Sequence, residues 1–203
     1  MKYRPELIDF FARESFISIL RNRFKTYGFN QINTPTFENY DLYSTVQGTI
    51  SKDEMLKVIS PNGKVLVLRP DVTIPVTQLV AIPYTGQTSE SRYSYITDIF
   101  RSSFETNYGY VKMQAGVELF GSTSAESDME VISLAIDCLT NLGFDGFKIQ
   151  LGHAGVVNEI LDILSLPPKK EEQFKQLIHS KNIAGLEEFM KTLTIEPAIK
   201  KRL

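Results

Sequence analysis

The stretch from Val111 to Gly121, VKMQAGVELFG, decides the fold of this chain. Its side chains alternate in character: one set is apolar, and the other contains Lys112, Gln114, Gly116 and Glu118. Successive side chains of a strand point to opposite faces of a sheet. The alternation therefore predicts a strand whose apolar face is buried.

The polar face of this strand carries a candidate ligand slot. Gln114 and Glu118 stand ~13 Å apart at about 3.3 Å per residue, and Gly116 between them has no side chain. An amide and a carboxylate on either side of a glycine floor would fit a small molecule. The same pattern fits a solvated strand face with an incidental glycine, and the spacing leaves both interpretations open.

The residues upstream predict further strands and helices. A second strand is expected over 93–101, paired antiparallel with the first through the polar segment 102–110. Asn62-Gly63 separates two β-rich runs, 55–59 and 64–69, and predicts a hairpin. The other expected elements are a helix over 7–26 ended by Gly28, extended segments over 29–33 and 36–38, and a helix over 76–81 that begins near Pro75 and ends at Pro83.

The residues downstream change from mixed to helical character. Thr123 to Glu126 matches the capping-box pattern and predicts a helix as far as Gly143. Alternating apolar residues predict a strand over 147–151. Helices are expected over 153–164, 168–180 and 183–193, with a last piece from residue 196.

The order of these elements predicts the fold class. Strands and helices mix without a regular βαβ alternation, which is typical of an α+β fold with an antiparallel sheet flanked by helices. We expect two parts, a core over residues 1–152 and a helical appendage over residues 153–203.

Composition excludes several classes of protein. The 203 residues include 22 Lys and Arg against 24 Asp and Glu, so no global basic field attracts nucleic acid or acidic membrane. No apolar run approaches the ~18 residues of a membrane-spanning helix. A single cysteine and an N-terminus without the apolar core of a secretory signal predict a cytoplasmic protein.

The sequence also argues against several catalytic chemistries. Two histidines and one cysteine support neither a zinc site nor a Cys–His pair. Cys138 is expected in the core, and a glycine-rich phosphate loop is missing. We therefore expect no metal, no cofactor and no catalytic residues.

Three residues outside the strand are candidates for ligand contacts. Asp71 and Thr73 lie just before the expected helix, where both side chains can accept hydrogen bonds from an ammonium group, or simply cap the helix. Arg101 ends the second strand, and its planar guanidinium suits a phosphate or carboxylate. An isolated arginine at a strand end is more often a surface charge.

The ordered set of motifs resembles histidyl-tRNA synthetase, and more closely its non-aminoacylating paralogue, the regulatory subunit of ATP phosphoribosyltransferase. The segments that carry the resemblance run over nearly the whole chain: YGF at 27–29, TPTFE at 34–38, LRPDVTIPV at 68–76, Phe100-Arg101, QAGVELFG at 114–121 and SDMEVI at 127–132. The resemblance implies a class II synthetase-like sheet and a dimer interface around Pro35.

The resemblance also implies a ligand. The positions matching Asp71, Thr73, Gln114 and Glu118 bind histidine in the synthetases, and the position matching Arg101 holds the α-phosphate of ATP or a substrate carboxylate. Glu118 would accept from an imidazole N–H, while Asp71 and Thr73 would take the ammonium group.

Departures from the synthetase pattern argue against aminoacylation. Ser103 stands where the synthetases carry an adenine-binding glutamate, and the sequence as given stops before the third class-defining motif. An adenylating enzyme needs several positive groups on the triphosphate, and only Arg101 remains.

We therefore expect a non-catalytic subunit that assembles with a short-form ATP phosphoribosyltransferase catalytic subunit and transmits histidine feedback, with tRNA not a partner. The alternatives are a fragment or degenerate form of a histidyl-tRNA synthetase, and a dimerisation module with a vestigial pocket.

Overall fold

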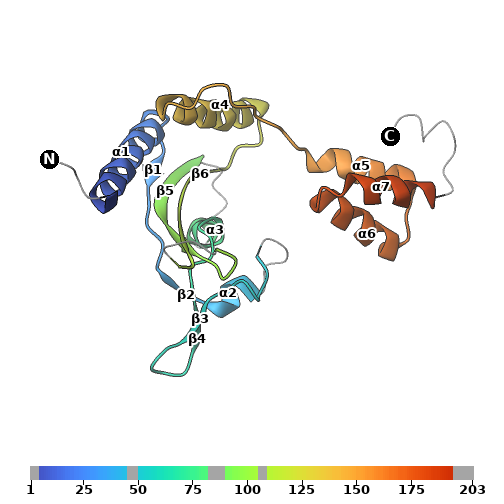
Figure 1. The fold of residues 1–203 in the computed structure, drawn as a ribbon, viewed down its shortest axis with the longest axis horizontal. Helices are drawn as coiled ribbons and strands as arrows, with labels where there is room; N and C mark the ends of the chain where they lie inside the picture. The colour runs from blue at the N-terminus through green and yellow to red at the C-terminus, as the bar shows by residue number, and fades with distance from the viewer. Residues whose placement is uncertain (1–4, 45–49, 82–89, 105–108, 194–203) are drawn as a thin grey trace. The chain divides into compact units, whose positions relative to one another are not determined.

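The computed structural model describes residues 5–44, 50–81, 90–104 and 109–193, and Figure 1 shows their course. The chain divides into two compact units, Met1–Gly146 and Phe147–Leu203. Each unit is described by itself. The sequence-based boundary after residue 152 stays a prediction.

Two long strands form the centre of the first unit. β5 (Ser91–Phe100) and β6 (Val111–Phe120) pair antiparallel along their whole length, and Tyr95 lies opposite Gly116 in their register. The short strand β1 (Asn30–Gln31) runs parallel to β5 on its other side. The antiparallel pair predicted from the alternating sequence is confirmed.

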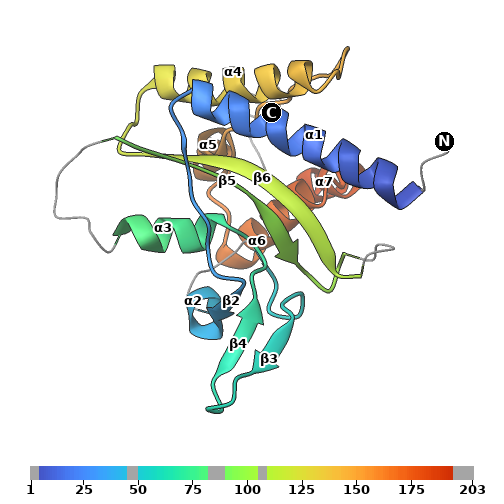
Figure 2. The same cartoon turned by 90° about the vertical axis from the view of Figure 1, so that its left-hand side faces the viewer.

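Two helices cover one face of this sheet. α1 (Pro5–Thr26) and α4 (Ala125–Asn141) lie along it in Figure 2. Phe24, Phe29, Leu134 and Cys138 form a buried cluster there, so the expected core position of Cys138 is confirmed. After α1 the chain turns at Gly28, whose φ of +77° is a backbone conformation that favours glycine.

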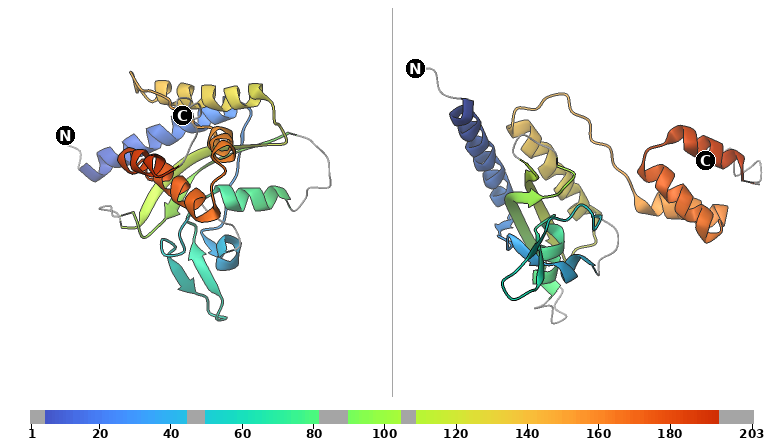
Figure 3. Two further views of the ribbon diagram at one scale, coloured as in Figure 1. Left: turned by 90° about the vertical axis from the view of Figure 1, so that its right-hand side faces the viewer. Right: turned by 60° about the horizontal axis from the view of Figure 1, so that its bottom comes forward.

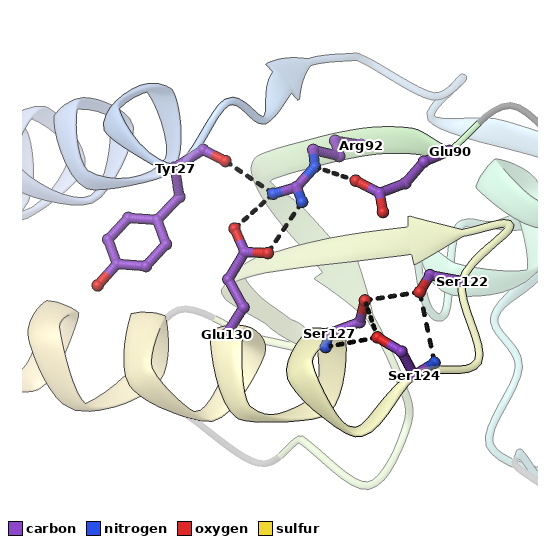
Figure 4. Close-up of polar contacts among 7 residues, drawn as sticks. All are labelled: Tyr27, Glu90, Arg92, Ser122, Ser124, Ser127 and Glu130. Carbon is purple, nitrogen blue, oxygen red and sulfur yellow. Dashed lines mark hydrogen bonds and ion pairs between the residues drawn. The ribbon is translucent and has the colours of Figure 1, made fainter.

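An arginine of β5 fastens both helices to the sheet, as Figure 4 shows. Arg92 donates to the carboxylate oxygens of Glu130 in α4 at 2.5 and 2.9 Å and to the backbone oxygen of Tyr27 at 3.1 Å. Glu90 accepts a further hydrogen bond from its Nε. We call the face of the sheet covered by α1 and α4 the helix face.

The other face of β5–β6 is covered by α3 (Thr73–Ala81), drawn on the opposite side from α1 and α4 in Figure 2. Val72, Val76, Tyr95 and Ile99 form the buried cluster between them. α3 begins three residues before the expected start of the helix, and the expected end at Pro83 lies outside the described residues. We call this second face the site face.

A smaller sheet adjoins the site face. Its strand order is β2 (Phe37–Asn39), β4 (Val65–Leu68) and β3 (Lys57–Ile59), all antiparallel. β3 and β4 form the predicted hairpin, and Gly63 in its turn has a φ of +80°. The helix α2 (Tyr40–Ser44), which the sequence did not predict, packs beside it, with Tyr43 in the core.

Arg69 ties the small sheet to the large one and is only 3% exposed. Its Nη1 donates to the backbone oxygens of Thr34 and Pro35 at 2.6 and 2.9 Å. Its Nη2 donates to the backbone oxygen of Asp98 at 2.7 Å and to the Thr97 hydroxyl at 2.5 Å. Burial of a guanidinium is tolerated here because its donors meet acceptors on both sides.

Two local expectations are wrong. The cap of α4 is Ser124, whose hydroxyl accepts from the amide of Ser127, rather than Thr123 (Figure 4). Residues 147–151 do not form a strand. The side chains of Phe147, Ile149 and Leu151 are 37%, 38% and 72% exposed, and among the described residues no strand pairs with this segment. Alternation alone is insufficient, because a strand needs a hydrogen-bonding partner.

The second unit contains the three helices drawn in orange and red in Figure 3: α5 (Ala154–Leu164), α6 (Pro168–His179) and α7 (Ile183–Lys191). Leu161, Phe174 and Phe189 form their common core. The nitrogen Nδ1 of His153 caps α5 by accepting from the amide of Gly155 at 3.1 Å. The three predicted helices are confirmed, and the piece expected from residue 196 lies outside the described residues.

Among the described residues, no helix is long and apolar enough to cross a bilayer, and no cluster of three or more metal-ligating side chains is present.

Candidate functional site

The start of α3 places two of the predicted site residues against the sheet. The carboxylate of Asp71 accepts from the amide of Ile74 at 3.1 Å, so it caps the helix while remaining 8% exposed. Thr73, two residues later, donates its hydroxyl proton to Glu118 of β6 at 2.7 Å. The structure therefore confirms that Asp71 caps the helix, and it places Thr73 against Glu118.

The open slot expected above Gly116 is filled by Tyr95. A Cβ atom on Gly116 would lie 2.5 Å from the hydroxyl oxygen of Tyr95 and 2.6 Å from its Cζ, closer than real side chains approach. The tyrosine ring crosses directly over the glycine backbone and is only 4% exposed. Glycine is required here because an aromatic ring on the neighbouring strand occupies the space of its missing side chain.

Gln114 and Glu118 lie on either side of that ring. The amide nitrogen Nε2 of Gln114 donates to the Tyr95 hydroxyl at 3.3 Å. The amide oxygen of Gln114 is buried and has no hydrogen-bond partner among the described residues. A buried acceptor without a partner costs free energy, so this oxygen is a natural point for a ligand donor.

The two carboxylates of the site share an environment that disfavours negative charge. Burial raises the pKa of Asp71, while the Ile74 amide and the charge of Arg101 lower it. Burial also raises the pKa of Glu118; hydrogen bonds from Thr73 and Tyr95 lower it, and the neighbouring charge of Asp71 raises it. A bound cation would relieve both the desolvation and the mutual repulsion.

Arg101 adjoins this acidic pair. Its Nε donates to the backbone oxygen of Pro70 at 2.9 Å, next to Asp71. Its guanidinium lies 5.4 Å from the ring centre of Phe104, and the ammonium of Lys112 lies 4.3 Å from the same centre. The site thus has an acidic part around Glu118 and Asp71, and a basic part at Arg101 and Lys112.

The fold brings together Asp71, Thr73, Gln114 and Glu118, with Arg101 beside Asp71. Tyr95 was missed by sequence reasoning, although it contacts the same groups. The signal that could have found it is the pairing of the two predicted strands: once Tyr95 is aligned with Gly116, a large ring faces a glycine.

Two cavities elsewhere do not carry such a constellation. One, of about 600 Å³, lies between α1 and the end of the β5–β6 pair, where Arg13 and Asp98 already form an ion pair of 2.9 Å. The other, of about 420 Å³, lies in the helical unit and is largely lined by apolar side chains such as Phe174 and Met190. Neither combines unpaired acceptors with a titratable pair.

The site face combines oxygen acceptors with a positive charge at one side. Its hydrogen-bond acceptors are oxygens of Asp71, Glu118 and Gln114, and Arg101 supplies a positive charge at one side.

Comparison with known proteins identifies the family. Residues 8–203 match the family model described as histidyl-tRNA synthetase. The chain belongs to the histidyl-tRNA synthetase family. The class II synthetase-like fold expected from the motifs is thereby confirmed.

Within this family, the chain is similar to proteins named ATP phosphoribosyltransferase regulatory subunit. The one from Oceanobacillus iheyensis is 47% identical over 196 residues, which cover 96% of this chain and 47% of that protein. The one from Acetivibrio thermocellus is 32% identical over 206 residues, covering 98% of this chain and 49% of that protein. The resemblance read from the motifs is confirmed, and the chain spans about half the length of these curated relatives.

Solved structures of family members share the fold. An ATP phosphoribosyltransferase regulatory subunit/histidyl-tRNA synthetase from Bacillus halodurans C superposes with a TM-score of 0.85 and 28% identity, covering 100% of this chain and 52% of the other. A histidine–tRNA ligase subunit from Alicyclobacillus acidocaldarius, with a TM-score of 0.78 and 19% identity, covers 97% of this chain and 56% of the other and supports the fold alone.

Proposed function

We propose that this chain acts as a regulatory subunit of ATP phosphoribosyltransferase, in the first step of histidine biosynthesis. The observation that carries the proposal is the 47% identity, over nearly the whole chain, to a protein of that name. Its partner is the short-form catalytic subunit, which it activates and through which it transmits inhibition by histidine. The coupling expected between two such sites is about 1–3 kcal/mol.

The site face is the proposed histidine site. Glu118 accepts from an imidazole N–H, and Asp71, with Thr73 beside it, receives the ammonium group. Gln114 supplies a buried amide oxygen, and Arg101 binds the carboxylate. The acidic pair supports this assignment, because burial raises the pKa of both carboxyl groups and a ligand cation would offset that burial.

The chain itself performs no bond chemistry in this proposal. Adenylation requires several positive groups around a triphosphate. In the described part of the site face only Arg101 and Lys112 approach such a role, and both lie against Phe104. The remaining features of the proposal are a cytoplasmic location, self-association as a dimer through the segment around Pro35, and no binding of tRNA.

A second candidate is a fragment or degenerate form of a histidyl-tRNA synthetase. The observation that favours it is the description of the matching family model. It predicts histidine-dependent exchange of pyrophosphate into ATP, and a dimerisation module with a vestigial pocket predicts neither exchange nor binding of histidine.

One titration separates these candidates. The cognate short-form catalytic subunit is assayed for ATP phosphoribosyltransferase activity with increasing amounts of this chain, with and without histidine. Saturable activation that histidine reverses supports the regulatory role. A Glu118→Gln variant should still activate but require more histidine for inhibition, because it keeps the shape and loses the charge.

The opposite results are equally informative. Absence of activation by this chain, together with activation by a longer relative, would show that this stretch alone does not perform the proposed regulation. Histidine-dependent pyrophosphate exchange by the chain alone would favour the synthetase candidate. Equal inhibition of the wild-type and Glu118→Gln mixtures would place feedback histidine elsewhere.

A further inference from the structure

The hydroxyl group of Tyr95 stands where the residues of the proposed histidine site meet. It accepts from Nε2 of Gln114 at 3.3 Å. It also hydrogen-bonds with Glu118, and the charge of that carboxylate contributes to a raised pKa of the phenol, after the larger effect of burial. Its ring is fixed over Gly116, where a single Cβ atom would collide with it.

The hydrogen-bond donors around the Tyr95 hydroxyl already have acceptors within the protein. Thr73 donates its hydroxyl proton to Glu118 at 2.7 Å. Tyr95 accepts from Gln114 and hydrogen-bonds with both Thr73 and Glu118, so its own proton serves these neighbours. At the start of α3, the amide of Ile74 donates to Asp71. The groups left over are oxygens: further lone pairs on the two carboxylates, and the buried amide oxygen of Gln114.

We propose that Tyr95 is the positioning residue that sets the polarity of this site, because it holds the amide nitrogen of Gln114 and so presents the amide oxygen, beside Glu118 and Asp71, to a compact organic cation with several N–H groups. This inference rests on the proposed function only in placing histidine at the same site. It adds Tyr95 to the site residues that were inferred from the motifs, and it predicts which ligands the site rejects.

The rule follows from the symmetry of an amide. A glutamine side chain can turn by 180° and exchange its donor and acceptor unless a neighbour fixes one end. With the Tyr95 hydroxyl present, a ligand that lacks N–H groups leaves buried acceptors unpaired and is rejected. Without the hydroxyl, the amide can turn to suit either kind of ligand. The preference for ligands with N–H groups over ligands of the same shape without them therefore falls.

The test measures discrimination between two ligands of similar shape. Histidine and 3-(2-thienyl)alanine differ in that the thiophene ring has no N–H group. Their affinities are measured by calorimetry with the whole chain as wild type, Tyr95→Phe and Tyr27→Phe. Tyr27 adjoins the core of the helix face, so its variant removes a hydroxyl from the opposite side of the sheet.

We expect Tyr95→Phe to lower the ratio of histidine to thienylalanine affinity by about tenfold, the effect of one hydrogen bond to a charged group, while Tyr27→Phe leaves the ratio unchanged. An unchanged ratio in folded Tyr95→Phe overturns the proposal. If that variant does not fold, Gln114→Leu decides in its place: it removes the amide and must lower the same ratio, and an unchanged ratio there overturns the proposal.

A third ligand separates this inference from the proposed function. Histamine keeps the imidazole and the ammonium group and lacks the carboxylate. If the wild type binds histamine and not histidine, the polarity rule is supported while the histidine-feedback assignment fails. If the wild type binds histidine and thienylalanine equally, the polarity rule fails while the assignment stands. Binding of neither histidine nor histamine contradicts both.

Discussion

The two faces of the β5–β6 sheet differ in whether their carboxylates form ion pairs. On the helix face, Arg92 meets Glu130 and Glu90, Arg13 meets Asp98, and Arg23 meets Asp137. On the site face, Asp71 and Glu118 are carboxylates without an ion pair among the described residues, and hydroxyl or amide groups are their partners.

The pKa directions follow the same division. The hydrogen bonds from Arg92 lower the pKa of Glu130, whereas burial raises the pKa of Asp71 and Glu118. Matched charges on the helix face hold helices to the sheet. On the site face the charge of Arg101 offsets only part of the effect of burial on Asp71, and carboxyl groups with a raised pKa are typical of functional sites.

The largest expected effect on stability concerns Arg69, the buried arginine that joins the small sheet to β5. Arg69→Met should lower the free energy of unfolding by about 3–5 kcal/mol, because it strands the carbonyl oxygens of Thr34, Pro35 and Asp98 and removes the charge that lowers the pKa of Glu38. Urea unfolding monitored by circular dichroism measures this.

The matched control is Arg13→Met. Arg13 also binds Asp98, but its side chain is 50% exposed, so its ion pair is screened and should be worth less than about 1 kcal/mol. Equal losses for the two variants would contradict the assigned importance of burial.

The next effect concerns the contact of Tyr95 with Gly116. Gly116→Ala should lower stability by about 1–3 kcal/mol, because its Cβ would lie 2.5 Å from the Tyr95 hydroxyl oxygen and the ring must move. Histidine binding should weaken in parallel. Thermal unfolding and calorimetry measure the two effects.

A double variant identifies the cause. In a Tyr95→Leu background the same Gly116→Ala change should cost much less, because the colliding ring is gone, and the coupling should exceed about 1 kcal/mol. Additive losses would show that Tyr95 is not the obstacle.

The smallest effect is also the sharpest test of the comparison. The pH dependence of stability should have opposite signs for the carboxyl groups of Glu118 and Glu130. A carboxyl whose folded-state pKa is raised contributes stability below its unfolded-state pKa, near 4.5, and that contribution is lost as the pH rises through the folded-state pKa. Glu118→Gln should therefore be more stabilising, relative to wild type, at pH 7 than at pH 4.

Glu130 should behave in the reverse way. Its pKa is lowered, so the contribution of its carboxylate is present at pH 7 and fades as the pH falls below about 4.5. Glu130→Gln should cost about 1 kcal/mol or less at pH 7, because the side chains of this pair are a quarter to a third exposed, and less still at pH 4. The same pH trend in both variants would refute the contrast between the faces.

Much of the site face could be predicted from the sequence because a strand's side chains alternate without reference to the rest of the molecule. Gln114, Gly116 and Glu118 had to share a face once β6 formed. The empty slot above Gly116 was wrong because its content depends on the neighbouring strand. Tyr95 enters through the β5–β6 register, which is not fixed by a short two-residue turn because ten residues, 101–110, separate the two strands.

The segment 147–151 also shows that a pattern within one segment does not decide its contacts with the rest of the molecule. Its alternation of Phe147, Ile149 and Leu151 is as regular as that of β6, yet it forms no strand. Hydrogen bonds between strands, rather than the pattern within one, decide whether an extended segment becomes part of a sheet.

The sequence by itself determined the α+β class, the long strands, the hairpin at Asn62-Gly63 and every described helix except α2, because each depends on neighbours within a few residues. Only the tertiary structure decided that Tyr95 crosses Gly116, that Thr73 of α3 bonds Glu118 of β6, and that Arg69 bridges two sheets. The separations are 21 positions for Tyr95 and Gly116, 45 for Thr73 and Glu118, and 29 to 35 for Arg69 and its partners Asp98 and Thr34. The geometry of these contacts exists only after the faces have packed.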